Sequence, residues 1–419
     1  MRALGTAGRT LYRRSPHLVW YWSGRDLLAC NYATRSRAFV EPIALEILHF
    51  FDTWRSAEEL FALMDNVSRK DLRTLVRLLI RRTFLQPNNG SIPRGEDAMN
   101  SWAEWNPAAG FFHNSTKDLR YADLPTIERL TREKAGRSVM PDPVKRYPGA
   151  QSFVLPPIHV PGEFASVLLA RRTWRRFGKE RIGISAFSTL LGLTAGVQAW
   201  AKGSAGQKVA LKTSPSGGAR HALEVYAVVS SVDGLAPGLY HYASDRHRLE
   251  LIDLRIRRHA IERYLPMQWW YSGASAIVLF SAVFPREQWR YTHARAYRAV
   301  LIEAGHLCQT FCLTATWLGL APFCSMALND SLIEADLKLD GVRESVLYAA
   351  GVGSRPPGVE WAAPARPVGE PRIMTAHEVR KAPGRILSLR PKVRTDTTGR
   401  PSAGGRALFR SPPRDRSRR

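Results

Sequence analysis

The pattern of hydrophobic and polar positions changes its period within the first hundred residues. Short apolar stretches near residues 17–32 give way to segments in which apolar residues recur about every 3.6 positions, which is typical of amphipathic helices. Ser56 and Ser68 precede acidic residues at the starts of two such segments and are predicted to cap helices. We predict a small helical domain with strand-like edges over residues 1–98, for which a winged-helix-like domain is one candidate.

The last predicted helix of this domain carries a row of four arginines, Arg73, Arg77, Arg81 and Arg82. Such a row is most often a solvated basic face. A surface that binds a peptide or a nucleic acid is the alternative, and the pattern leaves both interpretations open.

Residues 99–365 form a second predicted block, in which helical and strand-like patterns are interleaved. The turn-rich run "QPNNGSIPRG" (86–95) marks the boundary, and a proline-punctuated connector follows to about residue 161. Helices are predicted over "FASVLLARRTWRRF", over "SAFSTLLGLTAGVQAW" with Ser185 as its cap, and over "RAYRAVLIEAGHLCQTFCLTATWLGL". Strands are predicted over "HALEVYAVVSS", "GLYHYASDRHRLELID", "SGASAIVLFSAVF" and "SVLYAAGVGS". Because strands and helices do not alternate strictly, this order favours an α+β domain with a mostly antiparallel sheet.

The formal charge of +25 over 419 residues is concentrated at the C-terminal end. The stretch from Pro371 to Arg419 holds 14 Lys or Arg against three acidic residues, a balance of +11, in a sequence rich in Pro, Gly and Ser. Such a composition cannot bury enough apolar surface to fold, so residues 366–419 are predicted to be a disordered basic tail. Nucleic-acid binding is therefore a weak explanation for the charge of the whole chain.

The chain has four cysteines, Cys30, Cys308, Cys312 and Cys324. They include no CxxC pair and are too few for a disulfide framework, which favours a reducing compartment, with the cytoplasm as the default. Cys308 and Cys312 share a helix face near His306, but no second ligand pair accompanies them, so we interpret them as packed core residues and predict no metal site. The longest apolar segment, 299–320, contains Glu303, whose charge argues against a membrane span.

Two short runs carry chemistry suited to an anionic ligand. "RRTWRRFG" (171–178) offers four arginines, whose planar guanidinium groups suit a phosphate. In "TSPSGGARHALEVY" (213–226) the glycines let backbone N–H groups approach a ligand closely, immediately before a strand. From the residues alone, the first run could equally be a solvated basic helix end, and a plain loop is the favoured interpretation of the second run. Neither run is a dinucleotide-binding or Walker-type motif.

In order along the chain, "RRTWRRF", "SPSGGARHALEVY", "GLYHY", "WRYTHARAYRAVLIEAGHLCQTFCLTATWLGL" and "LYAAGVG" resemble the motifs of SagB-type dehydrogenases, a branch of the flavin-dependent nitroreductase-fold enzymes. The resemblance extends from about residue 111 to 355, and "ILHFFDTWRSAEEL" resembles the leading domain of the longer members, thought to handle peptide. It implies a nitroreductase-like FMN-binding fold and the FMN-dependent oxidation of azolines to azoles on a ribosomally synthesised peptide. It also implies a homodimer, with the precursor peptide and a YcaO-type cyclodehydratase as partners.

Carried over by position, the resemblance implies a cofactor site made from both runs and two later residues. Arg171, Thr173 and Arg175 would face the FMN phosphate, whereas Arg172 and Arg176 could simply be surface residues. Pro215 to Gly217 would lie along the isoalloxazine ring, where a Cβ would intrude. The predicted FMN-binding residues are Arg171, Arg172, Thr173, Arg175, Pro215, Ser216, Gly217, Gly218, Ser325 and Arg355.

Two departures from the family pattern bear on catalysis. Relatives commonly have Lys-Tyr where this chain has Arg290-Tyr291, and an arginine stays protonated and cannot act as a base. We therefore predict that Tyr291 is the catalytic base and that Arg290 favours its tyrosinate form or orients the substrate. Two ordinary surface residues before a helix are the open alternative. Relatives also have a Gly-Gly-Phe run where this chain has "FCSMALND" (323–330), so the flavin edge must differ there.

Two other functions stay open from the sequence. One is a divergent nitroreductase-fold oxidoreductase that acts on another small or peptidic substrate. The other is a basic protein that has lost the flavin and binds a peptide or nucleic acid. Bound FMN would separate the enzymes from the binding protein.

Overall fold

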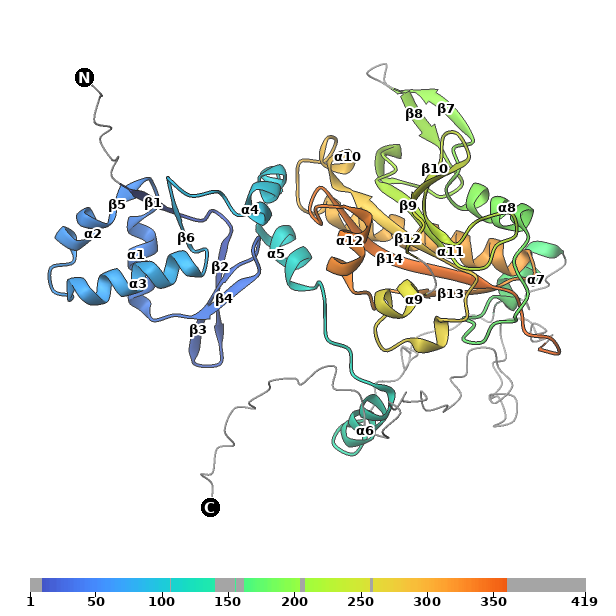
Figure 1. The fold of residues 1–419 in the computed structure, drawn as a ribbon, viewed down its shortest axis with the longest axis horizontal. Coiled ribbons are helices and arrows are strands. Elements are labelled where there is room, and N and C mark those ends of the chain that lie inside the picture. Colours follow the sequence, from blue (N-terminus) through green and yellow to red (C-terminus); the bar gives the residue numbers. More distant parts are fainter. Residues whose placement is uncertain are drawn as a thin grey trace.

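A computed structural model describes residues 10–105, 107–139, 155, 162–203, 208–256 and 259–359. The predicted basic tail, residues 366–419, lies outside the described residues. Among the described helices, none is both long enough and apolar enough to cross a membrane. Figure 1 shows a smaller N-terminal part and a larger part built on one main sheet, with α4 (Arg94–Met99) and α5 (Pro107–Ser115) between them.

The described residues of the N-terminal part, from residue 10 on, form three helices and two small antiparallel sheets. Its elements are β1 (Leu11–Arg14), β2 (Leu18–Ser23), β3 (Asp26–Asn31), β4 (Ser36–Phe39), α1 (Pro42–Phe50), β5 (Arg55–Ser56), α2 (Ala57–Leu63), α3 (Arg69–Arg81) and β6 (Leu85–Pro87). The strand orders are β5-β1-β6 and β2-β3-β4. The helices bury a common apolar core that includes Ile47, Leu60 and Leu72. Helices with strand-like edges are thus observed, whereas the winged-helix assignment and the boundaries 1–98, 99–365 and 366–419 stay predictions.

The two predicted serine caps differ in the structure. Ser56 is the N-cap of α2, and its hydroxyl accepts a hydrogen bond from the backbone N–H of Glu59 at 3.3 Å. Ser68 occupies the cap position of α3 but forms no side-chain cap bond. Both helices begin directly after the predicted cap residue, although only the hydroxyl of Ser56 accepts from a first-turn N–H group.

The segment after the N-terminal part packs onto the larger part through aromatic side chains. The indole of Trp102, in η1 (Asn100–Trp102), donates to the carbonyl of Val342 at 3.1 Å, and its ring contacts Phe284 and Tyr297. The predicted connector is therefore helical and packed as far as α5. Beyond it, α6 (Leu124–Ala135) buries none of its residues.

The larger part is built on a six-stranded sheet of order β11-β10-β9-β12-β14-β13, in which all neighbours are antiparallel. Its elements are α7 (Glu163–Ala170), α8 (Ile184–Ala195), β7 (Ala199–Lys202), β8 (Lys208–Leu211), η2 (Gly217–Ala219), β9 (Leu223–Val229), β10 (Gly238–Ala243), β11 (Arg248–Asp253), α9 (His259–Tyr264), η3 (Trp269–Tyr271), β12 (Ala276–Val283), α10 (Phe284–Gln288), α11 (Ala296–Trp317), β13 (Ala321–Ser325), α12 (Asp330–Leu337) and β14 (Glu344–Gly353). The predicted α+β class with a mostly antiparallel sheet is confirmed.

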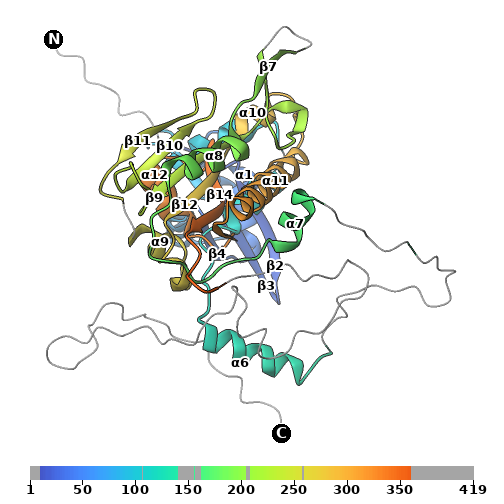
Figure 2. The ribbon, with the colours of Figure 1, turned by 90° about the vertical axis from the view of Figure 1, so that its right-hand side faces the viewer.

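Helices cover both faces of this sheet (Figures 1 and 2). On one face α8 and the long α11 share a core with Val278 of β12, and on the other face α9 and α12 share a core with Ile277. Successive side chains of a strand point to opposite faces, which is why β12 is apolar almost throughout. The segment 299–320 accordingly forms the predicted buried helix, α11.

The helix predicted to run through the arginine cluster stops before it. It ends at Ala170, and the following backbone is held extended by two hydrogen bonds to the main sheet. The N–H of Trp174 donates to the carbonyl of Pro322 at 2.8 Å, and the N–H of Gly178 donates to that of Ser354 at 2.9 Å. These tertiary hydrogen bonds take the place of intrahelical ones. The helical periodicity of the sequence therefore did not determine the conformation of residues 171–178.

Two further predictions differ from the structure. Ser185 does not cap α8 but lies within its first turn, and the helix ends at Ala195 rather than continuing into β7. The run "GLYHYASDRHRLELID" is a hairpin of β10 and β11 rather than one strand. Its turn contains His247 with φ of +50°, a left-handed conformation that apolar periodicity does not reveal.

Candidate functional site

The arginine run lies in the extended segment between α7 and α8. Successive side chains of an extended chain point to opposite sides, so Arg171, Thr173 and Arg175 are expected on one side and Trp174 on the other. Trp174 is 2% exposed and anchors the segment in the core, whereas its neighbours in the run are only half-buried. Arg175 also hydrogen-bonds to Tyr271, which stacks on Phe323 of β13. The predicted phosphate-facing residues thus belong to a segment fixed against β13.

Two of the predicted FMN-binding arginines contact backbone carbonyls at helix ends. Arg172 donates to two carbonyls at the C-terminal end of α7, at 2.7 and 2.9 Å. Arg355 donates to the carbonyl of Thr316 at the C-terminal end of α11 and to that of Leu320 just before β13, both at 3.1 Å, and lies over the ring of Trp174 at 5.5 Å. Cations are favoured at these ends, where carbonyls lack intrahelical donors. Both arginines therefore stabilise the frame around the arginine run.

The second run forms a loop against α11 that ends in η2. His306 of α11 donates through Nδ1 to the carbonyl of Pro215 at 3.4 Å. The hydroxyl of Ser216 accepts from the backbone N–H of His221 at 2.8 Å, which closes the loop. His306, considered above beside the cysteines, is thus a contact of this loop.

The two glycines of this loop lie against the chain's own side chains. A Cβ on Gly217 would lie 2.7 Å from Oε1 of Glu287, and a Cβ on Gly218 would lie 2.9 Å from the hydroxyl of Tyr291. Gly218 also has φ of +57°, which glycine adopts without strain. Side chains of the same chain therefore need the missing Cβ atoms at these positions. The sequence analysis had expected a flavin to need them.

The predicted catalytic pair belongs to what we call the α10 corner, residues 284–291. Helical geometry continues past α10, because the N–H of Tyr291 donates to the carbonyl of Glu287 at 3.0 Å. The guanidinium of Arg290 lies 5.8 Å from the ring centre of Tyr291, and both side chains border Gly218. The structure therefore brings Arg290 and Tyr291 together with the glycine loop.

Sequence reasoning missed one acidic residue of the α10 corner. Glu287 is 1% exposed, and neither carboxyl oxygen has a hydrogen-bond partner among the described residues. Burial, with a smaller contribution from the carboxylate of Glu303, raises the pKa of Glu287 to about 7. Glu303 of α11 is also buried, and burial raises its pKa too. Nothing in "FPREQWRY" indicates that its one acidic side chain points inward, so no sequence signal was available.

The arginine run and the glycine loop contact different stretches of α11 within one chain. The loop borders the helix from Ala299 to His306, and Ser214 before it bonds Thr310 at 2.8 Å. Arg355, beside the arginine run, contacts Thr316 near the end of the helix. From His306 to Thr316 the helix rises about 15 Å at 1.5 Å per residue.

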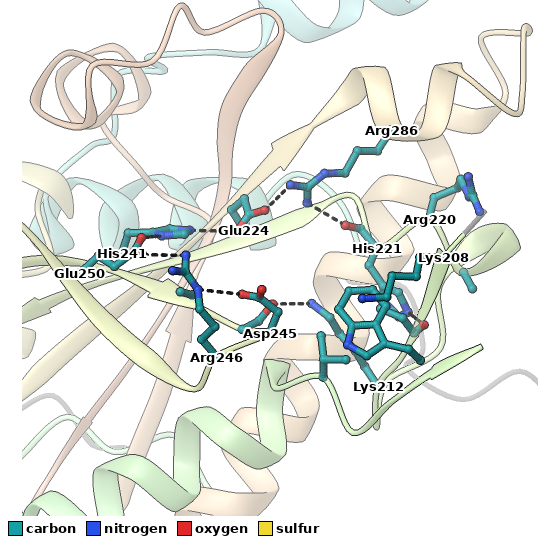
Figure 3. Close-up of a pocket in the computed structure, with 16 residues that line it drawn as sticks. Lys208, Lys212, Arg220, His221, Glu224, His241, Asp245, Arg246, Glu250 and Arg286 are labelled. Atoms are coloured by element: carbon teal, nitrogen blue, oxygen red, sulfur yellow. Dashed lines mark hydrogen bonds and ion pairs between the residues drawn. The ribbon is translucent and has the colours of Figure 1, made fainter. Parts of the chain in front are cut away.

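A charged cavity of about 370 Å³ opens between the β7–β8 hairpin and the end of the main sheet (Figure 3). Glu224 lies at its centre, where it accepts from Nε2 of His241 at 3.0 Å and from Arg286. Nδ1 of His241 in turn contacts Glu250 at 3.0 Å. These carboxylates raise the pKa of His241. Burial alone would raise the pKa of Glu224, but His241 and Arg286 lower it.

Comparison with known proteins gives a family match within the larger structural part. The nitroreductase family matches residues 168–354, which span the arginine run, the glycine loop, the α10 corner and β14. Residues 168–354, somewhat less than half of the chain, are similar to the nitroreductase family. The predicted nitroreductase-like fold is thereby confirmed for this domain, which we call the nitroreductase domain.

Individual relatives cover different shares of the chain. The trifolitoxin-processing protein TfxB of Rhizobium leguminosarum bv. trifolii is 33% identical over 144 residues, which are 33% of this chain and 38% of TfxB. MJ1384 of Methanocaldococcus jannaschii, named as a nitroreductase, is 29% identical over 190 residues, 45% of this chain and 89% of MJ1384. A chain of the E. coli microcin synthetase McbBCD complex with truncated pro-MccB17 bound is 20% identical, with a TM-score of 0.40, over 57% of this chain and 85% of that chain. The chain thus covers little more than a third of TfxB.

The remaining predicted residue of the nitroreductase domain, Ser325, ends β13. Its hydroxyl donates to Gln268 at 2.7 Å and accepts from the backbone N–H of Ala327 at 3.1 Å. Met326, in the run that lacks the family glycines, is 78% exposed. The side chain at the predicted flavin edge is thus a large, exposed methionine.

The nitroreductase domain also brings three of the four cysteines together. The Sγ atoms of Cys308, Cys312 and Cys324 lie within 4.8 Å of one another. Hydrogen bonding from Cys312 and burial raise the pKa of the Cys308 thiol. A raised pKa keeps a thiol protonated, which suits the predicted role in core packing.

Proposed function

We propose that this protein is an FMN-dependent dehydrogenase that oxidises azoline rings to azoles on a ribosomally synthesised peptide. The nitroreductase domain supports an oxidoreductase. The similarity to a trifolitoxin-processing protein carries the peptide part of the proposal, because it links this chain to a protein that processes a peptide product. The N-terminal domain would hold the precursor peptide, and a YcaO-type cyclodehydratase in the same cytoplasm would supply the azoline.

The donors of the arginine run fit the phosphate of FMN. The segment from 164 to 178 contains no Asp or Glu, so it offers guanidinium groups and a hydroxyl without a competing carboxylate. Arg171, Thr173 and Arg175 would bind the phosphate by charge-assisted hydrogen bonds. Arg172 and Arg355 would support it indirectly through the helix ends that they cap. When bound, FMN supplies the acceptor for the hydride that leaves the substrate.

A homodimer would complete this site. On α11, Leu301, Ile302 and Trp317 are 39%, 58% and 46% exposed, unusually high for large apolar side chains on a central helix. If two copies of α11 pack antiparallel about a two-fold axis, the arginine run of one protomer meets the glycine loop of its partner. The exposed apolar side chains of α11 are the observation that favours this arrangement.

Tyr291 is the proposed base in this site. It borders the glycine loop, and its hydroxyl is the group of the α10 corner that can both accept and donate a proton near Gly218. Arg290, beside its ring, would favour the tyrosinate or orient the substrate. Tyr291→Phe removes one oxygen, so FMN should stay bound while the rate falls by about 10²–10⁴, the usual contribution of a general base.

The proposed function is tested first by the cofactor. The purified full-length protein should be yellow and should release FMN on denaturation. The double substitution of Arg171 and Arg175 by Ala should weaken FMN binding by several kcal/mol, since charge-assisted bonds contribute about 1.5–3 kcal/mol each. The second step is anaerobic reduction of the bound FMN by a synthetic thiazoline peptide. A colourless protein that takes up no added FMN would refute the enzyme and favour a binding protein.

A further inference from the structure

Three of the four cysteines, which we call the thiol trio, meet at one place in the nitroreductase domain. Cys308 and Cys312 lie four residues apart on α11, and Cys324 lies on β13. Their Sγ atoms are all within 4.8 Å of one another. The prediction of no metal site rested on spacing in the sequence, which does not show that β13 supplies a third thiol. Three thiols on two packed elements can act together as ligands.

The spacing of the three sulfur atoms suits one metal ion. An ion at the centre of a triangle with sides of at most 4.8 Å lies at most about 2.8 Å from each corner, and metal–thiolate bonds such as those of zinc are about 2.3 Å long. Shifts of about 0.5 Å therefore bring all three sulfur atoms onto one ion. Residues four apart on a helix share a face, which lets Cys308 and Cys312 bind the same ion.

The surroundings of the thiol trio are apolar and largely closed to water. Cys308 and Cys312 are 3% and 4% exposed and belong to the core between α11 and the main sheet, against which the half-buried Cys324 also packs. Among the described residues, no fourth His, Cys, Asp or Glu joins the trio. Structural zinc sites and iron–sulfur clusters both take four protein ligands. Copper(I), a soft ion that accepts three sulfur ligands, fits the trio better.

The charge beside the thiol trio also favours a cation held by thiolates. The positive charge of Arg171 favours the thiolate forms of Cys312 and Cys324, and Tyr348 of β14 hydrogen-bonds to Cys324. Copper(I) bound by two thiolates and one thiol carries a single negative charge, which the guanidinium of Arg171 balances. Such pairing matters because a buried charge without a partner is costly.

We propose that Cys308, Cys312 and Cys324 form a binding site for one copper(I) ion. The ion displaces thiol protons, which pass to the solvent, so sulfur–copper bonds replace sulfur–hydrogen bonds and no electron is transferred. Without the ion, the three protonated thiols pack in the core. With it, the second half of α11 is linked to β13 through the metal. The site requires neither bound FMN nor the proposed reaction.

The first test titrates the reduced, metal-free, full-length protein with copper(I) under anaerobic conditions, in competition with a copper(I)-specific chelator. A single ion per chain should bind and produce an ultraviolet sulfur-to-copper charge-transfer band. Cys324→Ser should weaken binding by about 10²-fold or more, because a hydroxyl is a poor ligand for a soft ion. Equal affinities of Cys324→Ser and wild type would overturn the inference.

Cys30→Ser is the matched control for this titration. Cys30 is also a buried free cysteine, but it lies on β3, outside the thiol trio. This variant should bind copper(I) as tightly as wild type does. Loss of binding in Cys30→Ser would mean that the copper ion is held elsewhere.

The second test needs no substitution, so it does not depend on how well a variant folds. X-ray absorption at the copper edge of the loaded wild-type protein should show sulfur ligands at about 2.3 Å and no nitrogen or oxygen ligand. Nitrogen ligands, as from surface histidines, would refute the site. Excess zinc(II) should not displace the copper(I), because zinc lacks its fourth ligand here. Displacement by zinc(II) would show that the choice of copper(I) is wrong.

Discussion

Glu224 and Glu287 are two acidic residues near one end of the same sheet, and their surroundings shift their pKa values in opposite directions. Glu224 is bonded by His241 and Arg286, which lower its pKa although burial alone would raise it. Glu287 follows Arg286 in the sequence, yet it has no partner among the described residues, and burial raises its pKa to about 7. Partners, rather than burial alone, decide which carboxyl is ionised.

The two carboxyl groups therefore differ in whether they can exchange a proton near neutral pH. Glu224, His241 and Glu250 form a closed chain of bonds along three neighbouring strands, and Figure 3 shows their side chains directed at one another. Such a network stabilises the sheet end and leaves Glu224 no capacity to exchange protons near neutral pH. Glu287 keeps that capacity because Arg286 turns away from it.

The largest expected effect is on stability at alkaline pH in Glu287→Gln. The folded-state pKa of Glu287 is raised to about 7 from about 4.5 unfolded, so its contribution to stability is complete below about pH 4.5 and is lost as the pH rises through 7. The loss amounts to about 3 kcal/mol at pH 9. Glu287→Gln cannot ionise and should lack this decline when urea unfolding is followed from pH 5 to pH 9.

Glu224→Gln is the matched control and should behave in the opposite way. Because the pKa of Glu224 is lowered in the folded state, its contribution is present above the unfolded pKa and is lost as the pH falls. This variant should therefore be less stable than wild type at neutral pH. Equal pH profiles for the two variants would mean that the contrast between the two carboxyls is wrong.

A smaller effect is expected for Gly217→Ala. The added Cβ would lie 2.7 Å from Oε1 of Glu287, so one of the two must move, at a cost of about 1–3 kcal/mol. In a Glu287→Ala background the obstacle is absent, and the same substitution should cost much less. Thermal unfolding of the two single variants and the double variant gives the coupling energy. Additive costs would show that Glu287 does not lie against this loop.

His241→Gln should change stability by about 1 kcal/mol, since it removes a charge-assisted contact at a partly exposed site. Its partners, Glu224 first, raise the folded-state pKa of His241. Its contribution is therefore complete below about pH 6.5 and is lost as the pH rises through the folded pKa. Unfolding at pH 5.5 should distinguish the variant from wild type more than unfolding at pH 9. A constant difference across this range would exclude ionisation of His241 as the cause.

The smallest effect is expected for Arg290→Lys. Lysine keeps the positive charge beside Tyr291 and restores the residue common in the family, so stability should change by less than about 0.5 kcal/mol and turnover should be retained. Arg290→Ala is its control and should lower the rate of FMN reduction. If both variants keep the wild-type rate, Arg290 is surface and the α10 corner acts without it.

Much of the fold could be predicted because its signals are local. The apolar run of β12, the long amphipathic period of α11 and the glycine-rich end of β14 each identify one element without reference to the others. The order of motifs also led to the nitroreductase family, since the residue types that suit a phosphate can be recognised in an isolated segment. The conformation of the arginine run could not be predicted, because its N–H groups bond to carbonyls of β13 and of the residue after β14, which are distant in sequence.

The sequence by itself determined the residue types available for chemistry: a donor run without carboxylates, a tyrosine beside an arginine, and a glycine pair that permits close approach. Only the tertiary structure decided which of them meet. It placed Arg290 and Tyr291 at the glycine loop, put Arg355 and the arginine run near the C-terminal end of α11, and enclosed Glu287 while Arg286 paired with Glu224. Burial and pairing depend on contacts between segments distant in sequence, and these contacts set whether a carboxyl group carries a charge.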